Sequence, residues 1–249
     1  MPGERIAVSV VSHRQSALVE PFLRELAALA LPGLEARLTV NVPEPWAYDP
    51  CALGVPLRRF DNDSPRGFAA NHNAAFRASP CDYFCVANPD IRLRGNPFAP
   101  LVEALRQPAA GVAAPIVLSP AGEIEDSARR FPTPAILLRK AFGAKEPAPA
   151  EPDWVAGMFM LFRAETYRAM GGFDEGFFMY YEDVELCARL RLAGRRVALV
   201  RAARVVHHAQ RASHRNLRHA WWHAGSIARY FLSGTYARLR HAGALGNAP

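Results

Sequence analysis

The sequence predicts an α/β fold, in which a mostly parallel β-sheet is flanked by helices and followed by a C-terminal helical extension. Short runs of β-branched and apolar residues alternate with segments of helical period, and short connections join them. Half of the 249 residues are apolar, which is enough for a sizeable core. No window offers about 18 uncharged apolar residues, so we expect no membrane-spanning helix.

The first half of the chain alternates regularly between expected strands and helices. Each strand is a short apolar run that stops at a polar residue, a glycine or a proline. The expected strands are 6–11, 38–42, 55–60, 82–87 and 111–118. The helices expected between them are 16–30, 67–78 and 97–106. Ser12 is expected to cap the first helix, which should end before Pro32 and Gly33.

The second half begins with a stretch, 119–152, in which six prolines interrupt this alternation. We interpret it as a long connection with a helix near 135–142, because proline disfavours both helix interiors and central strands. After it the pattern resumes. The expected strands are 154–162, 196–200 and 204–207, and the expected helices are 164–170, 181–193 and about 214–240.

Charge is unevenly distributed along the chain. The formal net charge is +7, yet no Asp or Glu follows Glu185, whereas twelve arginines lie between Arg189 and Arg240. A segment of one sign indicates a negatively charged partner, which could be anionic lipid, a phosphate-bearing substrate or nucleic acid. The four cysteines have neither disulfide-scaffold nor zinc spacing. The N-terminus lacks the long apolar run of a signal peptide, so we expect a cytoplasmic protein.

Polar residues follow one of the central expected strands directly. Asn88-Pro89-Asp90 comes after 82–87, and in an open α/β sheet ligands bind at the carboxyl ends of the strands. A carboxylate there suits Mg²⁺ or Mn²⁺, which take few protein ligands and complete their shells with substrate phosphate oxygens. The alternative is an ordinary Asn-Pro-Asp turn.

A second polar group ends an aromatic segment. After the glycine pair Gly171-Gly172 come five aromatic residues, and then the adjacent carboxylates Glu182 and Asp183. The aromatic residues are Phe173, Phe177, Phe178, Tyr180 and Tyr181. Aromatic rings beside carboxylates suit a sugar, and a carboxylate in a partly dry wall can act as a general base. The alternative is an aromatic core beside the acidic first turn of a helix.

Four blocks in a fixed order give the chain a family resemblance. They are 8–12 (VSVVS), 67–73 (GFAANHN), 88–90 (NPD) and 171–183 (GGFDEGFFMYYED), and 205–207 (VVH) follows them. With these blocks the chain resembles the family 2 inverting glycosyltransferases of the GT-A fold, within the rhamnosyltransferase-like group of cell-surface polysaccharide enzymes. The resemblance runs from residue 6 to about 208 and continues weakly to about 231.

The resemblance implies roles for the two acidic motifs. Asp90 would hold a divalent cation, Mg²⁺ or Mn²⁺, on the donor diphosphate, and Asn88 stands where the family usually has its first Asp. Asp183 would be the catalytic base, with Glu182 positioning sugar hydroxyls. His207 would be a second metal ligand, while the adjacent His208 would point to the other face of its strand.

The resemblance also implies donor and acceptor contacts. Those expected for the donor are Ser12, Arg14, Arg66, Gly67, Asn71, Asn73, Asn88 and Asp90, and those for the acceptor are Trp154, Gly157 and Tyr181. The chain departs from the family pattern at 41–45, where an acidic motif is usual, and at Pro65, where Asn is frequent. Both departures concern the contacts with the nucleotide base.

The implied organisation is a GT-A domain over 1–210 and a basic, aromatic helical extension over 211–249. Residues 1–118 would form the nucleotide-sugar half and 153–210 the acceptor and catalytic half. The implied activity is metal-dependent, inverting transfer of a sugar, rhamnose first, from a dTDP or UDP sugar to a glycan or lipid-linked acceptor. A catalytically degenerate sugar-nucleotide-binding relative is the alternative. A nucleic-acid partner is not expected, because no recognisable nucleic-acid-binding module is present.

The extension has the composition of an interfacial helix. Its arginines and aromatic residues include Arg211, Arg215, Arg218, Arg229, Arg238, Arg240, Trp221, Trp222, Tyr230 and Phe231. Such a segment is expected to hold the enzyme peripherally on an anionic membrane, at the inner face. The alternatives are that the aromatic residues pack back on the domain or form a homodimer contact.

Overall fold

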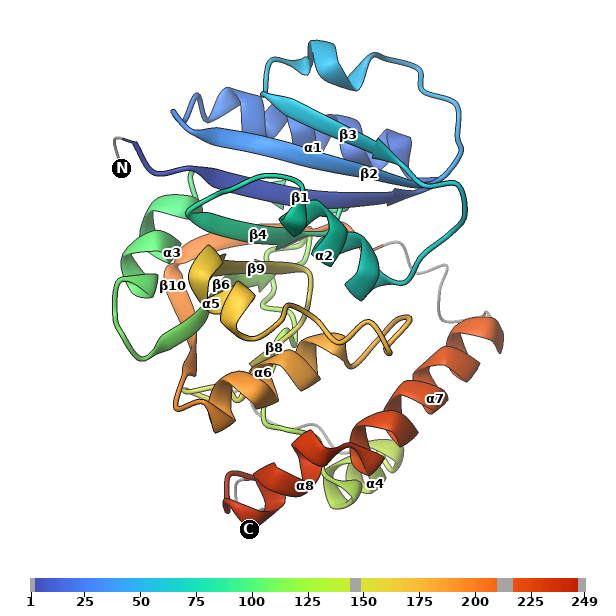
Figure 1. Ribbon diagram of the computed structural model, residues 1–249, viewed down its shortest axis with the longest axis vertical. Helices are drawn as coiled ribbons and strands as arrows, with labels where there is room; N and C mark the ends of the chain where they lie inside the picture. The colour runs from blue at the N-terminus through green and yellow to red at the C-terminus, as the bar shows by residue number, and fades with distance from the viewer. Residues whose placement is uncertain (1–2, 144–148, 210–216, 246–249) are drawn as a thin grey trace.

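The computed structural model describes residues 3–143, 149–209 and 217–245, and an eight-stranded sheet lies at its centre (Figure 1). The strand order is β3-β2-β1-β4-β9-β6-β10-β5. The strands of this sheet are β1 (Ile6–His13), β2 (Leu34–Val42), β3 (Leu57–Asp61), β4 (Tyr83–Ala87), β5 (Ile91–Leu93), β6 (Ala110–Leu118), β9 (Phe159–Arg163) and β10 (Arg196–His207). A separate two-stranded ribbon pairs β7 (Ala128–Arg129) with β8 (Trp154–Val155).

The α/β prediction is confirmed, but the sheet is mixed beyond its first four strands. The pairings β3–β2, β2–β1 and β1–β4 are parallel, as is β6–β10. Strand β9 runs antiparallel to both β4 and β6, and β5 runs antiparallel to β10. The sheet therefore changes direction next to β4, the strand that Asn88-Pro89-Asp90 follows.

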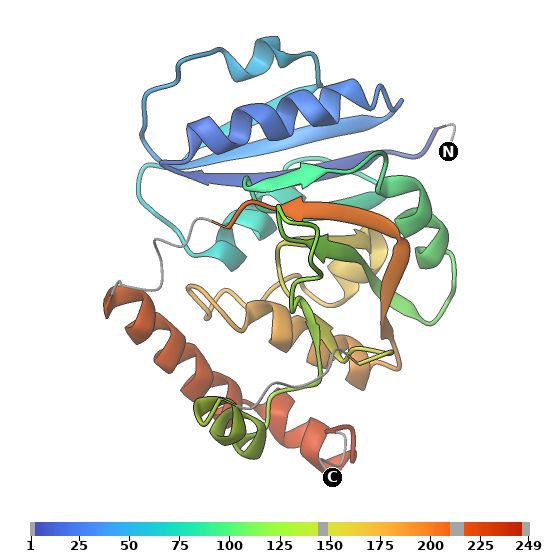
Figure 2. The same cartoon turned by 180° about the vertical axis from the view of Figure 1, so that it is seen from behind.

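Helices cover both faces of the sheet (Figures 1 and 2). Alternate residues of β1 point to opposite faces, so that Val8 and Val10 join one core and Ala7 the other. The first core packs against α1 (Ser16–Ala28) and α3 (Phe98–Leu105), and the second against α2 (Phe68–Arg77), α5 (Ala164–Ala169) and α6 (Glu182–Leu192). A short 3₁₀ helix, η1 (Pro50–Leu53), lies between β2 and β3.

Three more helices lie below the sheet in Figure 1, namely α4 (Pro134–Ala141), α7 (Leu217–Leu232) and α8 (Gly234–His241). The expected C-terminal helical extension is present as two helices rather than one over 214–240. The break falls at Ser233, whose hydroxyl accepts a hydrogen bond from the amide of Tyr236 and so caps α8. Arg211 and residues 214–216, which include Arg215, lie outside the described residues.

Several expected boundaries differ from the structure for identifiable reasons. The expected strands 196–200 and 204–207 form one strand, β10, because a shift of register between Val200 and Arg204 is absorbed within it. The expected strand 154–162 is two strands, β8 and β9. Ser12 does not cap α1, as its hydroxyl donates to Glu44 at 2.5 Å, and Gln15 occupies the cap position without a side-chain bond. Strands β5 and β7 are too short to have a sequence pattern.

No helix within the described ranges is long and apolar enough to cross a membrane.

Candidate active site

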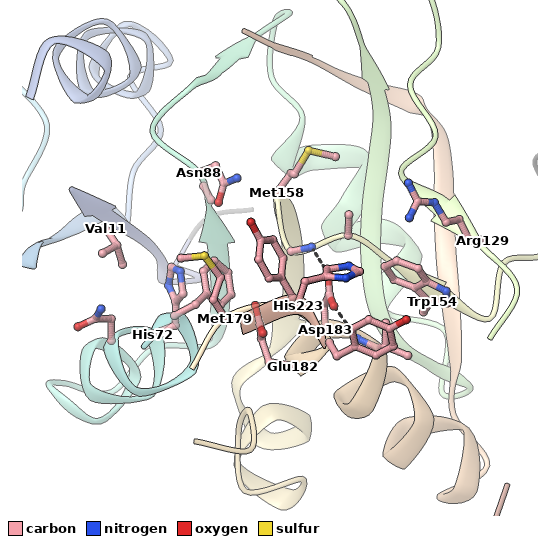
Figure 3. Close-up of a pocket in the computed structure, with 18 of the residues that line it drawn as sticks. Val11, His72, Asn88, Arg129, Trp154, Met158, Met179, Glu182, Asp183 and His223 are labelled. Atoms are coloured by element: carbon pink, nitrogen blue, oxygen red, sulfur yellow. Dashed lines mark hydrogen bonds between the residues drawn. The ribbon is translucent and has the colours of Figure 1, made fainter. Parts of the chain in front are cut away.

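A cavity of about 660 Å³ opens where β1 and β4 end, and residues of α2, α4, α6 and α7 line it. Figure 3 shows many of its lining side chains. Val11 of β1, Ala87 of β4 and Phe68 of α2 line it, which places it at the carboxyl ends of parallel strands. The predicted residues that line this cavity are Arg66, Asn71, Asn88, Asp90, Trp154, Gly157, Tyr181, Glu182 and Asp183. The fold thus brings the two acidic motifs together around one cavity, although Asp90 and Glu182 are 92 positions apart in the sequence.

The pairing of two short strands brings His207 next to Asp90. Strand β5 begins immediately after Asp90, and its first residue, Ile91, pairs with His207 at the end of β10. The Nε2 atom of His207 lies 3.2 Å from Oδ2 of Asp90. The adjacent His208 is exposed, and only its amide bonds with Asp90, donating to the carbonyl at 2.9 Å. The histidine that faces the site is therefore His207.

A third residue holds the His207 ring. The Nδ1 atom of His207 lies 2.8 Å from Oε2 of Glu125, which belongs to the connection between β6 and β7. Burial lowers the pKa of His207, but hydrogen bonds and charge from Asp90 and Glu125 outweigh burial and raise the pKa to about 9. His207 is not among the residues that line the cavity; its ring, fixed through Nδ1, presents Nε2 to Asp90, which does line it, and carboxylate–histidine–metal arrangements hold a ring in the same way.

These residues fit a divalent cation that takes most of its ligands from substrate. The Oδ1 atom of Asp90 is buried and has no hydrogen-bond partner among the described residues, so a polar atom is left for a ligand. Within the described ranges, no group of three or more His, Cys, Asp or Glu side chains could enclose a metal. Two protein ligands are nevertheless sufficient for Mg²⁺ or Mn²⁺ when phosphate oxygens and water supply the others.

The walls near Asn88 carry amide side chains. Asn41 accepts a hydrogen bond from the amide of Arg66 at 2.8 Å and donates to its carbonyl at 2.9 Å, which fixes the turn before α2. Asn62 bridges Asn41 and Asn71 with bonds of 2.8 and 2.7 Å. Asn41 lies where the family usually has an acidic motif, and here its amide orders the turn that presents Arg66.

Four of the predicted donor contacts do not line the cavity. Ser12 is buried against Glu44. Asn73 is buried on the far side of α2, where it bonds the amide and carbonyl of Phe173 at 3.0 and 2.9 Å. Arg14 lines a smaller neighbouring pocket with Arg218 and Trp222. Gly67 precedes α2, and a Cβ there would meet the carbonyl oxygen of Phe178 at 2.6 Å, so this position requires glycine for close packing.

Backbone strain positions the two catalytic candidates at the start of α6. Tyr180 and Tyr181 both have left-handed backbone conformations, with φ of 72° and 68°, which non-glycine residues adopt only when the surroundings impose them. Asp183 then accepts hydrogen bonds from the amides of Gly157 at 2.9 Å and Val184 at 2.8 Å. Figure 3 shows both bonds and places the Asp183 carboxylate in the middle of the cavity wall.

The electrostatics of this carboxylate pair favour proton transfer. Burial raises the pKa of Glu182 well above its ordinary value, and the neighbouring Asp183 raises it further. Burial also raises the pKa of Asp183, against the hydrogen bonds from Gly157 and Val184, which lower it. One Glu182 oxygen, Oε2, is buried without a partner among the described residues. Raised carboxyl pKa values in a cavity are typical of general acids and bases.

Several cavity residues were not predicted from the sequence. Arg129, Arg130 and Lys140 come from the 119–152 connection, and His223 comes from α7. Lys140 and His223 lie on helices that the sequence does predict, but helical period alone does not show which side chains enter the cavity. His72 also lines the cavity, where it bonds the hydroxyl of Ser9 at 2.8 Å, and burial lowers its pKa to about 3, so its ring is neutral.

Comparison with solved structures defines the fold class. The mannosyltransferase PcManGT from Pyrobaculum calidifontis, in complex with GDP-Man and Mn²⁺, matches 98% of this chain and 76% of its own, with a TM-score of 0.62 and 17% identity. GalNAc-T7 with UDP, GalNAc and Mn²⁺ matches 82% of this chain and 43% of its own, with a TM-score of 0.59 and 16% identity. The fold is the GT-A fold of glycosyltransferases.

Sequence comparison narrows this class. Rhamnosyltransferase WbbL of Escherichia coli is 32% identical over 66% of this chain and 69% of its own length. The N-acetylglucosaminyl-diphospho-decaprenol L-rhamnosyltransferase of Mycobacterium tuberculosis is 31% identical over 64% of this chain. The chain belongs to the rhamnosyltransferase-like glycosyltransferases. It spans 63% of the length of the mycobacterial relative, and no family model matches it.

Proposed function

We propose that this protein is a metal-dependent, inverting glycosyltransferase that moves rhamnose from a nucleoside-diphosphate sugar to a lipid-linked or glycan acceptor. The observation that supports this most is that Asp90 and Asp183 line one cavity at the carboxyl edge of the sheet. The names of the two relatives support rhamnose as the sugar, and that of the mycobacterial relative supports a lipid-linked diphosphate acceptor. The nucleotides and Mn²⁺ of the structural neighbours support a nucleotide-sugar donor and a divalent cation.

The reaction is a single displacement at the anomeric carbon. An acceptor hydroxyl oxygen forms a bond to this carbon while the bond to the donor diphosphate breaks, and the diphosphate keeps the electron pair. Asp183 takes the proton of the attacking hydroxyl, for which its raised pKa is suited. Attack from the face opposite the leaving group inverts the anomeric configuration, so no enzyme nucleophile is needed.

Asp90 and His207 would hold Mg²⁺ or Mn²⁺ against the donor diphosphate. A bound divalent cation neutralises the negative charge that develops on the leaving diphosphate. Glu125 keeps the His207 ring turned toward Asp90, and Asn88 is placed to hydrogen-bond the donor rather than to ligate strongly. The Tyr181 and Trp154 rings form the wall on which the acceptor sugar would lie.

Direct assay tests the proposal. The purified protein is incubated with dTDP-rhamnose, Mn²⁺ and a prenyl-diphosphate-linked N-acetylglucosamine, and the product is analysed by mass spectrometry and anomeric NMR couplings. Inverted product that depends on the metal supports the proposal. Asp90→Ala should abolish the metal enhancement of nucleotide binding in calorimetry, and His207→Ala should reduce it less. Unchanged enhancement in Asp90→Ala would refute the metal assignment.

A catalytically degenerate sugar-nucleotide-binding relative is the second candidate, because Asn88 stands where the family usually has Asp. The two candidates differ in a single measurement. The degenerate relative would bind dTDP or UDP sugars in a thermal-shift panel and would neither hydrolyse nor transfer them when Mn²⁺ is present.

A further inference from the structure

The cavity has a second, basic end that the proposed donor site does not use. Figure 3 shows Val11 and Asn88 on one side of Asp183, and Arg129 and Trp154 on the other. Away from the turn before α2 that presents Arg66, the cavity is lined by three basic side chains, which we call the basic cluster. They are Arg129, Arg130 and Lys140. They come from β7, from the residue after it and from α4.

The basic cluster is held in place and remains accessible. The Arg129 guanidinium lies over the Trp154 ring, 5.2 Å from its centre, and its Nε is 2.9 Å from Asp126. Arg130 lies 3.7 Å from the buried carboxylate of Asp153, and half of its side chain is exposed. Lys140 makes no ion pair with any residue that the structure describes. The cluster therefore presents more positive charge to the cavity than its acidic partners neutralise.

An apolar strip adjoins the basic cluster. Ile136 is buried and Leu137 is partly buried, and both line the cavity beside Lys140 on the same face of α4. The next residue, Leu138, points away from the cavity and is 61% exposed, and Phe142, just after the helix, is 84% exposed. The helix thus carries apolar residues from the cavity interior out to the protein surface.

Cationic groups beside an apolar strip match one ligand chemistry, a phosphate bonded to a hydrocarbon chain. Arginine and lysine form charge-assisted hydrogen bonds to phosphate oxygens, and the arginine fork suits two oxygens at once. Ile136 and Leu137 would bury methylene groups, and each buried CH₂ would strengthen binding about fourfold. A free sugar or an uncharged glycan would use neither feature.

We propose that the basic cluster binds the phosphate of a prenyl-diphosphate-linked acceptor, whose hydrocarbon chain leaves the cavity along Ile136 and Leu137 of α4. This inference rests on the proposed function and assigns its acceptor side. The sugar of the acceptor then lies between the basic cluster and Asp183, with its hydroxyl directed at the carboxylate and its phosphate at Lys140. The donor diphosphate occupies the opposite end, at Asp90.

Binding of farnesyl diphosphate, without metal and in the presence of EDTA, tests this subsite. Lys140→Gln and Arg130→Gln should each weaken binding about 10- to 150-fold, the fold-change that corresponds to roughly 1.5–3 kcal/mol for a hydrogen bond to a charged group. The matched control is Arg139→Gln, which removes an exposed charge next to Lys140 on the same helix and should leave affinity within about twofold. Circular dichroism melts confirm that each variant is folded.

A second pair of variants tests the proposed path of the hydrocarbon chain. Leu137→Ser should weaken farnesyl diphosphate but not inorganic diphosphate, whereas Leu138→Ser, one residue along and exposed, should change neither. Equal wild-type affinity for the two probes would overturn the hydrocarbon path. An Arg139→Gln effect as large as that of Lys140→Gln would overturn the cluster as a specific site.

The donor diphosphate is the competing occupant. Weakened dTDP binding in Lys140→Gln, with farnesyl diphosphate binding unchanged, would assign the basic cluster to the donor and overturn the proposal. Failure of the proposed function is seen separately, as absence of sugar transfer by the wild-type protein, and the binding measurements do not depend on transfer.

Discussion

Both ring nitrogens of His207 face carboxylates, Asp90 through Nε2 at 3.2 Å and Glu125 through Nδ1 at 2.8 Å. The second contact should strengthen metal binding, because a carboxylate behind a histidine fixes the ring and raises its strength as a ligand. We predict that Glu125→Ala lowers the affinity for Mn²⁺ by about 10- to 100-fold, which calorimetry with the metal alone measures. Glu123→Ala, an exposed neighbour, is the control, and equal affinity in the two variants would disprove the positioning role.

Asp183 is the residue on which the proposed chemistry depends most. An amide in its place cannot accept the acceptor proton, although it can still accept a hydrogen bond from Gly157. Asp183→Asn should therefore lower turnover by roughly 10²–10⁴-fold and leave the dissociation constant of the nucleotide unchanged. Because the pKa of Asp183 is raised, the wild-type rate should increase with pH through that raised value. Retention of more than about a tenth of the turnover would exclude Asp183 as the base.

The protonation of Glu182 affects the stability of the folded protein. Its pKa is raised in the folded protein, so the folded state keeps a proton that the unfolded state loses. The stabilisation from this proton is complete below the unfolded pKa and is lost as pH rises through the folded pKa. The melting temperature of Glu182→Gln should thus exceed that of wild type by an amount that grows from pH 4 to pH 8. Glu165→Gln, whose side chain is 77% exposed in wild type, should show no such trend.

At this scale, sequence reasoning located the residues that belong to compact motifs. Asp90 and Asp183 line the cavity, and His207 meets Asp90 because β5 and β10 pair, although their roles remain predictions. Asn73 belongs to the same helix as Asn71, yet it faces away from the cavity, since residues two apart on a helix point in different directions. Glu125 was not predicted, because nothing in the sequence around it indicates its contact with His207.

The segment between α5 and α6 is held by a close contact with α2. Gly171 and Gly172 both have left-handed backbones, with φ of 74° and 72°. A Cβ on Gly171 would meet nothing within 4 Å, whereas one on Gly172 would collide with the Asn73 side chain that orders Phe173. Gly171→Ala should cost about 1–2 kcal/mol of unfolding free energy from backbone strain alone.

Gly172→Ala should cost about 1–3 kcal/mol more than Gly171→Ala, because the collision adds overpacking to the same strain. Urea unfolding of the two variants measures the difference. Equal losses would show that the Asn73 contact yields without cost and does not fix the position of this segment.

Most helices were predictable and the shortest strands were not. Helices α2 and α3 lie within one residue of their expected ends, because each has an apolar stripe and a stop signal. Helix α6 does so too, although it is buried on most sides, because acidic residues mark its first turn and Gly194 follows it. Strands β5 and β7 contain three and two residues, too few for any alternation to be visible. Both nevertheless contribute to the candidate site, since β5 pairs with β10 at His207 and β7 carries Arg129.

On the scale of the whole molecule, the C-terminal helices are part of the same body as the sheet. Tyr230 and Leu239 are fully buried in the second core. Thr235 bonds Glu185 of α6 at 3.0 Å, and Ser226 bonds the carbonyl of Met179 at 2.8 Å, just before the strained tyrosines. Helix α7 therefore supports the segment that presents Asp183, and it adds His223 to the cavity wall.

This packing changes the expectation of an interfacial helix formed by all the aromatic residues. Trp222 lies against Phe178, with ring centres 4.8 Å apart, and Tyr230 is buried, so these two pack back on the domain. Among the described residues of α7, the large apolar side chains that remain exposed are those of Trp221 at 79% and Leu232 at 87%. Sequence composition could not separate the two groups, because helical period alone does not show which face meets the sheet.

The protein should still bind anionic membranes. We expect Trp221 and Leu232 of α7 to contact the membrane together with Phe142, just after α4, and with the arginines of α7 and α8. Each arginine near an anionic surface can contribute about 1 kcal/mol. We expect co-sedimentation with phosphatidylglycerol vesicles that fades with salt, and a loss of binding in Trp221→Ser/Phe142→Ser. Removal of the chain after Ala209 is not a clean test, since it takes Tyr230 and Leu239 from the core. Ile124→Ser, which removes a 66% exposed apolar side chain from the connection between β6 and β7, is the control. Equal recovery with neutral and anionic vesicles would contradict the prediction.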